Sequence, residues 1–152
     1  MQANSIETHL ASPLGLALFA ILFALLWCAS SFWVSWVSGW HSLVRRFKYQ
    51  AEPYADIESS GSFASVYLRY WSHYSGVVFL TAGEDALYVS IMFLFRVGHP
   101  PLRIPWGEIR FGRRKFFFRT YIVLTLGNEE KIPMRISLRM ARNLGLLDRC
   151  PQ

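Results

Sequence analysis

The stretch that decides the fold is LGLALFAILFALLWCASSFWVSWV, residues 14–37, which contains no charged side chain. A bilayer core takes about 20 helical residues, so this segment predicts a single tilted transmembrane helix. Pro13 suits the first turn of such a helix, because an amide hydrogen at that position would have no helical partner. We place the transmembrane helix at residues 14–40, after a short extracytoplasmic N-terminus at residues 1–13.

Two other interpretations of this segment are weaker. A buried helix would need a domain large enough to cover it on all sides, and a chain of 152 residues leaves too little for that. A cleaved signal peptide begins with a positive region, but residues 1–12 contain Glu7 and neither lysine nor arginine. The sequence therefore favours a segment that is retained as a membrane anchor.

The residues after the apolar run predict the orientation of the helix. Trp33, Trp36 and Trp40 recur at positions i, i+3 and i+7 and are typical of an interfacial aromatic belt. Arg45, Arg46 and Lys48 follow on this side only. By the positive-inside rule, the N-terminus lies outside and the chain from about residue 45 onward lies in the cytoplasm.

The overall composition limits the partners without selecting one. The net charge of +6 admits a nucleic acid, an anionic bilayer surface or an acidic protein. The two cysteines, Cys28 and Cys150, lie far apart in the sequence and make no disulfide framework, which fits a domain in a reducing compartment.

A small β-domain is predicted after a juxtamembrane segment and linker at residues 41–61. Residues 50–61, QAEPYADIESSG, are rich in acids and serine and are typical of a solvated loop. From residue 62 the apolar residues alternate with polar ones, which is the period of a β-strand. Strands are expected at residues 63–71, 76–82, 86–95, 102–105, 108–111, 116–126 and 132–136.

The turns and the end of the domain are also marked. Gly112–Lys115, GRRK, is expected to form a basic turn. Ser137 can cap a closing helix of about ten residues, with an apolar stripe made by Met140, Ala141, Leu144 and Leu147.

Three motifs together resemble the pleckstrin-homology-like (PH-like) superfold, in particular its GRAM-like and bacterial members. They are VVFLTAGEDALYVSI (77–91), LRIPWGEIRFGRR (102–114) and IVLTLGNEEKIPMRI (122–136), followed by the closing helix. The resemblance covers residues 62–148 and implies an all-β antiparallel sandwich or barrel closed by a C-terminal α-helix. A similarity of the FLFR.GHPPL.IPW core to bacterial single-pass proteins implies the bacterial inner membrane, and it implies no activity.

No motif indicates catalysis, a metal or a cofactor. The four histidines show no HxH or HExxH spacing, and the two cysteines form no CxxC motif. His99 lies between Gly98 and Pro100, so an ordered turn with the ring packed on proline is expected. Glu84 and Asp85 are expected in a solvated turn. We therefore predict neither catalytic residues nor metal ligands.

Basic residues interleaved with phenylalanines form the most distinctive cluster: Arg103, Arg110, Arg113, Arg114, Lys115 and Arg119. Cations near an anionic membrane gain about 1 kcal/mol each, and PH-like domains often bind headgroups through such a loop. Contact with lipid, contact with a partner protein and simple solvation all remain open for this cluster. A nucleic acid is not expected, because the membrane tether restricts access and no nucleic-acid-binding motif occurs.

The sequence thus predicts a non-enzymatic, membrane-anchored binding or scaffold protein, an accessory or assembly subunit of a larger inner-membrane complex. Small residues would let the helix pack against a helix of a partner protein: Ala29, Ser30, Ser31, Ser35 and Ser38. The alternative is a stand-alone module that binds anionic lipid or a small ligand. The oligomeric state is left open.

Overall fold

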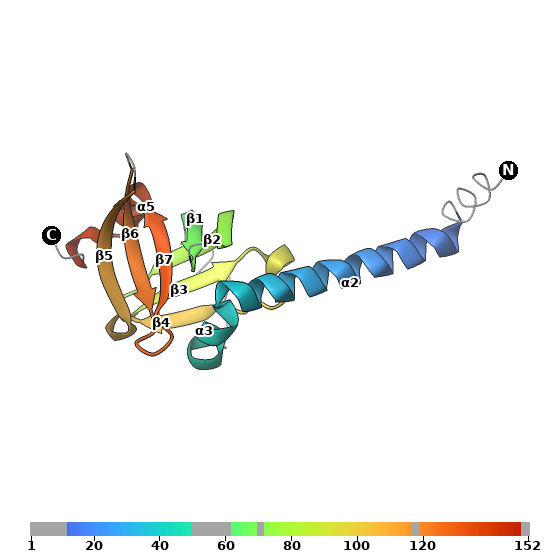
Figure 1. Cartoon of the computed structure of the whole chain (residues 1–152), viewed down its shortest axis with the longest axis horizontal. Coiled ribbons are helices and arrows are strands. Elements are labelled where there is room, and N and C mark those ends of the chain that lie inside the picture. The colour runs from blue at the N-terminus through green and yellow to red at the C-terminus, as the bar shows by residue number, and fades with distance from the viewer. Residues whose placement is uncertain (1–11, 50–61, 70–71, 117–118, 150–152) are drawn as a thin grey trace.

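A long helix projects from one end of a curled β-sheet in a computed structural model of the chain (Figure 1). The structure describes residues 12–49, 62–69, 72–116 and 119–149. The predicted extracytoplasmic residues 1–11 and the acidic linker at 50–61 lie outside the described residues.

Helix α2 (Pro13–Ser38) is long and apolar enough to cross a membrane, with a mean hydropathy of 2.2. Ser12 caps its N-terminus, since the Ser12 hydroxyl accepts a hydrogen bond from the Gly15 amide at 3.1 Å. Only 6% of its most apolar window is buried against the rest of the protein. The helix therefore needs an apolar surrounding along most of its length, as the sequence predicts.

Gly39 ends α2 and turns the chain into the short helix α3 (Trp40–Phe47). Its backbone has a φ of 83°, which a residue with a side chain rarely adopts. A Cβ atom here would also lie 2.6 Å from Nε of Arg69. The transmembrane helix was predicted to continue to residue 40, but this glycine stops it at Ser38.

Trp40 belongs to the core of the domain and not to an interfacial belt. It starts α3, its side chain is 1% exposed, and its Nε1 donates a hydrogen bond to the carbonyl of Pro100 at 2.9 Å. Trp33 and Trp36 lie on α2 with exposed rings 5.9 Å apart. The expected face of three tryptophans is thus wrong for Trp40, because the turn at Gly39 directs that ring into the sheet.

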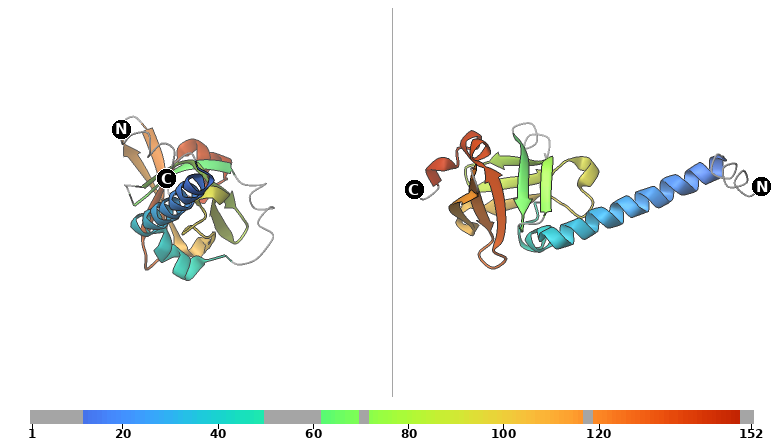
Figure 2. Two further views of the ribbon diagram at one scale, coloured as in Figure 1. Left: turned by 90° about the vertical axis from the view of Figure 1, so that its right-hand side faces the viewer. Right: turned by 45° about the horizontal axis from the view of Figure 1, so that its top comes forward.

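Seven antiparallel strands form one sheet in the order β4-β3-β2-β1-β7-β6-β5. The sheet curls into a half-barrel, as the two views of Figure 2 show together. The strands are β1 (Ser62–Leu68), β2 (Ser72–Ala82), β3 (Ala86–Ile91), β4 (Leu102–Pro105), β5 (Ile109–Phe116), β6 (Arg119–Leu126) and β7 (Ile132–Ser137).

The predicted alternation fills the core. Leu124 of β6 pairs with Met134 of β7, and Ile122 pairs with Ile136, so these side chains share one face of the sheet. All four are buried. One edge of the sheet is covered by the chain that follows α3, because the Tyr49 amide donates to the Pro101 carbonyl at 2.9 Å.

Two local predictions are wrong. The strand that starts at Ala86 ends at Ile91, and the next residues form the short 3-10 helix η1 (Phe93–Phe95), which leaves Phe93 exposed. The expected basic turn at residues 112–115 is part of β5, where Gly112 pairs with Val123. The alternating pattern continues beyond the end of β3, so it predicted a strand that is too long. Gly112 was interpreted as a turn residue, but it lies within β5 and pairs with β6.

The closing helix is present but shorter than predicted. Helix α5 (Leu138–Asn143) is capped by Ser137, whose hydroxyl accepts from the Met140 amide at 3.2 Å. Gly145 then adopts a φ of 64° and ends the helical run, before a 3-10 turn, η3 (Leu147–Arg149). A second 3-10 turn, η2 (Trp106–Glu108), joins β4 to β5.

We predict that Trp40→Ala lowers the free energy of unfolding of the domain by about 3–5 kcal/mol, since it removes a fully buried indole. Trp36→Ala is the matched control on an exposed ring and should change stability far less. Chemical denaturation in mild detergent, followed by circular dichroism, measures both. Equal losses in the two variants would contradict the assignment of Trp40 to the core.

Candidate functional site

One face of α2 is polar and lies against the domain. Ser31, Ser35 and Ser38 recur on this face and are buried, with Ser35 only 1% exposed. Their small side chains let the helix approach the sheet domain closely. The sequence indicated a close-packing face here, but these three serines contact the protein's own domain instead of a partner helix.

The loop between η1 and β4 receives this face of the helix. The Ser35 hydroxyl donates a hydrogen bond to the Gly98 carbonyl. Gly98 has a φ of 78°, and a Cβ atom on it would lie 3.0 Å from Cα of Phe32. Backbone thus meets backbone at this point, and only glycine allows both the contact and the conformation.

Trp27 extends the contact by more than two helical turns toward the N-terminus of α2. Its indole Nε1 donates to the Leu94 carbonyl at 3.1 Å, and its ring lies 5.3 Å from the ring of Phe95. The helix is therefore fastened to the domain along the whole stretch from Trp27 to Ser38.

A buried polar group lies beneath this contact, contributed by α2, β2 and the η1–β4 loop. The Tyr74 hydroxyl lies 3.0 Å from Oγ of Ser38 and 2.9 Å from Nε2 of His99. A phenol has one proton, so Tyr74 donates to one of these atoms and accepts from the other. Nδ1 of His99 lies 3.3 Å from the Val97 carbonyl, which fixes the opposite side of the ring.

Burial sets the charge state of this group. It lowers the pKa of His99 below 6.5, and hydrogen bonds to the carbonyls of Val97 and Phe95 only partly oppose that shift. Burial also raises the pKa of Tyr74 above 10. Both side chains are therefore neutral at pH 7.

The surroundings of His99 combine a turn with two aromatic rings. Its amide donates to the Arg96 carbonyl at 2.8 Å, so the expected ordered turn is present. The ring packs edge-on against Trp40 and Tyr74 at 5.3 and 5.7 Å.

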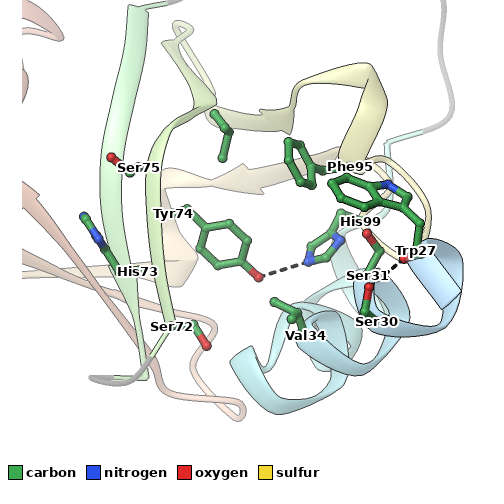
Figure 3. A pocket seen from close by; sticks show the side chains of 11 residues that line it. Trp27, Ser30, Ser31, Val34, Ser72, His73, Tyr74, Ser75, Phe95 and His99 are labelled. Carbon is green, nitrogen blue, oxygen red and sulfur yellow. Dashed lines mark hydrogen bonds between the residues drawn. The ribbon is translucent and has the colours of Figure 1, made fainter. Parts of the chain in front are cut away.

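A cavity of about 570 Å³ opens beside this polar group, between α2 and the first residues of β2 (Figure 3). Trp27, Val34, Val77 and Phe95 supply apolar walls. Tyr74 and His99 point toward one another between the helix and the strand, and further polar side chains line the cavity: Ser30, Ser31 and Ser72. The side chains of His73 and Ser75 point to the other side of β2. An amphipathic or apolar ligand would fit this lining.

The lining of the cavity offers groups suited to binding an amphipathic ligand. Hydroxyl and imidazole groups can hold a polar end of a ligand, while the indole and phenyl rings hold an apolar part. Among the residues that the structure describes, no three His, Cys, Asp or Glu side chains gather closely enough to hold a metal ion.

The three cations predicted beside the membrane, Arg45, Arg46 and Lys48, lie in different surroundings. Arg46 forms ion pairs with three carboxylates, those of Glu108 at 2.8 Å, Glu129 at 3.3 Å and Glu130 at 3.8 Å. It therefore joins α3 to the β6–β7 turn. Arg45 and Lys48 are exposed.

The predicted basic cluster is divided by the sheet. Arg103 lies on β4 and pairs with Asp85, and its guanidinium holds the pKa of that carboxyl below 3.8. The other residues of the cluster lie on the β5–β6 hairpin, where Arg119 belongs to β6 and the exposed side chains are those of Arg110, Arg113, Arg114 and Lys115.

The β5–β6 hairpin stands at the end of the domain away from α2 (Figure 1). Its exposed cations alternate along β5, so Arg110 and Arg114 share one face while Arg113 and Lys115 share the other. Phe117 and Phe118, which were part of the predicted cluster, lie outside the described residues.

Neither a protein-family model, nor a curated protein, nor a solved structure matches this chain. The arguments for a function therefore come from the sequence and from the geometry described above.

We predict that the free energy of unfolding falls as the pH is lowered through about 6.5, because the unfolded chain binds a proton at His99 more readily than the folded one. His99→Gln should flatten this slope. Denaturation curves at a series of pH values measure the slope, and identical slopes for the wild-type protein and His99→Gln would contradict the prediction.

Proposed function

We propose that this is a non-enzymatic, membrane-anchored binding protein of the bacterial inner membrane, which serves as an accessory or assembly subunit of a larger complex. In this proposal α2 spans the bilayer with its N-terminus outside, and the β-domain lies in the cytoplasm. The positive charge after the helix supports this orientation.

The observation that carries the proposal is the fastening of the helix to the domain. Contacts from Trp27 to Trp40 leave no flexible joint between α2 and the sheet. A flexible tether would only keep the domain near the membrane. A fixed helix also sets the direction in which the domain faces, which is what a subunit of an ordered assembly requires.

Two surfaces are suited to a partner. Phe32, Trp33 and Trp36 are large and exposed on α2 and can pack against a helix of a membrane protein. The exposed cations of the β5–β6 hairpin can bind an acidic protein surface. Their distance from the helix end of the domain favours a protein partner over the lipid surface for this cluster.

We further propose that the domain belongs to the PH-like superfold. The strand order, the curl of the sheet and the capped helix after β7 support this assignment, together with the three sequence motifs. The motifs that carry this resemblance are structural and not catalytic, which agrees with the proposed role.

We predict that the full-length protein, purified in mild detergent, carries stoichiometric membrane-protein partners, and that Ser35→Leu reduces their recovery several-fold. A leucine cannot fit between α2 and Gly98, so the helix would separate from the domain while staying in the membrane. Mass spectrometry of the co-purified proteins gives the ratio.

Ala24→Leu is the control, because it adds the same side chain at an exposed position of the same helix, outside the small residues that were predicted to pack on a partner helix. Circular dichroism and the yield from the membrane fraction check that both variants fold. A wild-type protein that purifies alone, or equal recovery of partners with both variants, would contradict the accessory-subunit proposal.

The alternative function is a ligand-binding or lipid-binding module that acts alone, and the 570 Å³ cavity is the observation that favours it. We predict that Ser30→Phe, which adds a ring at the cavity wall, would then release a co-purified lipid or small molecule. Native mass spectrometry of the released species measures this, with Ala29→Phe as the control outside the cavity. An unchanged ligand content in Ser30→Phe would exclude the cavity as the site.

A further inference from the structure

Segment 92–97, which contains η1, exposes several large apolar side chains beside α2. Phe93 is 72% exposed, Leu94 49% and Val97 43%. Figure 1 places η1 against the side of the helix, at the end of the domain from which α2 projects. An apolar surface of this kind marks a contact with a membrane or with another molecule.

The length of the free part of α2 determines what surrounds this segment. Pro13 to Leu26, the part before the first contact with the domain at Trp27, measures about 21 Å at 1.5 Å per residue. A bilayer hydrocarbon core is about 30 Å thick. A helix that begins to cross the core at Pro13 leaves it only near Phe32, beyond Trp27.

Trp27 carries η1 to the same depth. The hydrogen bond from its indole to the Leu94 carbonyl and its ring contact with Phe95 join the two segments directly. Trp33, which is exposed one and a half turns after Trp27, then lies where an interfacial tryptophan is expected. If α2 spans the bilayer, η1 lies on the hydrocarbon side of the headgroups, among the acyl chains.

The backbone of the segment is suited to such a position. The Phe95 amide donates to the Met92 carbonyl at 2.9 Å, and the Arg96 amide donates to the Phe93 carbonyl at 3.1 Å. The Met92 amide in turn donates to the Val77 carbonyl of β2 at 2.9 Å. These backbone donors are satisfied within the protein, which is the requirement for non-helical chain in an apolar medium.

The distribution of charged residues agrees with a position of segment 92–97 in an apolar medium. Residues 86–95, ALYVSIMFLF, contain no charged side chain, and the first one, Arg96, is only partly exposed. The segment therefore presents mainly apolar groups to a bilayer, with Arg96 as its one charged side chain.

We propose that segment 92–97 is a second membrane anchor, which inserts Phe93, Leu94 and Val97 among the acyl chains of the leaflet on the domain side. The proposal rests on the membrane-spanning position of α2 in the proposed function. We call segment 92–97 the hook. Attachment through both α2 and the hook prevents the domain from tilting about the helix. The cavity beside Trp27 and Phe95 then opens at the level of the lipid.

The test uses the full-length protein in phosphatidylcholine–phosphatidylglycerol vesicles, in a background where Cys28→Ala and Cys150→Ala remove the native thiols. An environment-sensitive fluorophore is attached to a single cysteine in each variant. Phe93→Cys labels the hook, and Ala20→Cys labels the part of α2 that is free of the domain. Arg142→Cys labels an exposed position on α5 and serves as the reference in water. Lipids brominated on the acyl chain quench a fluorophore that lies among the chains.

We expect quenching at positions 20 and 93 to be several-fold stronger than at position 142. Leu94→Cys provides a second label in the hook, since the Leu94 carbonyl and not its side chain holds Trp27. If the label at position 20 is quenched while the labels at 93 and 94 are exposed to water, the insertion of segment 92–97 is refuted. The membrane-spanning position of α2 is then still supported.

Two further outcomes would also overturn the inference. Absence of quenching at position 20 would refute the membrane-spanning helix, and the hook with it. Labels at 93 and 94 that are shielded from water but not quenched by the lipids would show that a protein, a second copy included, covers the segment.

Discussion

The close approach of α2 to the loop at Gly98 is the constraint on which the rest of the structure depends. A membrane helix made only of large apolar residues would be held away from the domain by its own side chains. Serines at 31, 35 and 38 remove that bulk, and Gly98 removes the remaining Cβ on the other side. The hydroxyls of Ser35 and Ser38 have partners in the loop and in Tyr74, so their burial against the domain costs little.

The position of this contact divides the functions of the helix. The large apolar side chains of its N-terminal part are exposed on all sides of the helix, so an apolar medium such as lipid or other membrane segments would have to cover them. Its C-terminal part is a structural element of the domain, because Gly39 turns the chain and Trp40 enters the core beside His99. The same residues thus determine where the exposed apolar part of α2 ends and how the sheet is placed. In the proposed membrane-anchored protein, a change at the contact would alter the orientation of the domain without removing the anchor.

The sequence predicted the helix and most strands, because hydrophobic length and period-two alternation are local properties. The predicted alternation agrees with the burial of Ile122 and Leu124 on β6 and of Met134 and Ile136 on β7. The sequence-based prediction failed where a tertiary contact overrides the pattern. Trp40 continues the spacing of Trp33 and Trp36, but one left-handed glycine redirects it. Phe93 continues the alternation of β3, but the chain leaves the sheet at Met92 to meet Trp27. The Tyr74–His99–Ser38 group joins residues far apart in the sequence, and no spacing could reveal it.

The separation of apolar and basic surfaces bears on the kind of partner. The helix, η1 and the cavity lie at one end of the domain, whereas the cations of the β5–β6 hairpin lie at the other (Figure 1). Attraction to an anionic leaflet decays within about 8 Å at physiological salt, so cations gain from it only when they lie close to the headgroups. If α2 spans the bilayer as proposed, the basic hairpin points away from it, and an acidic protein surface is the partner that we propose for its charge.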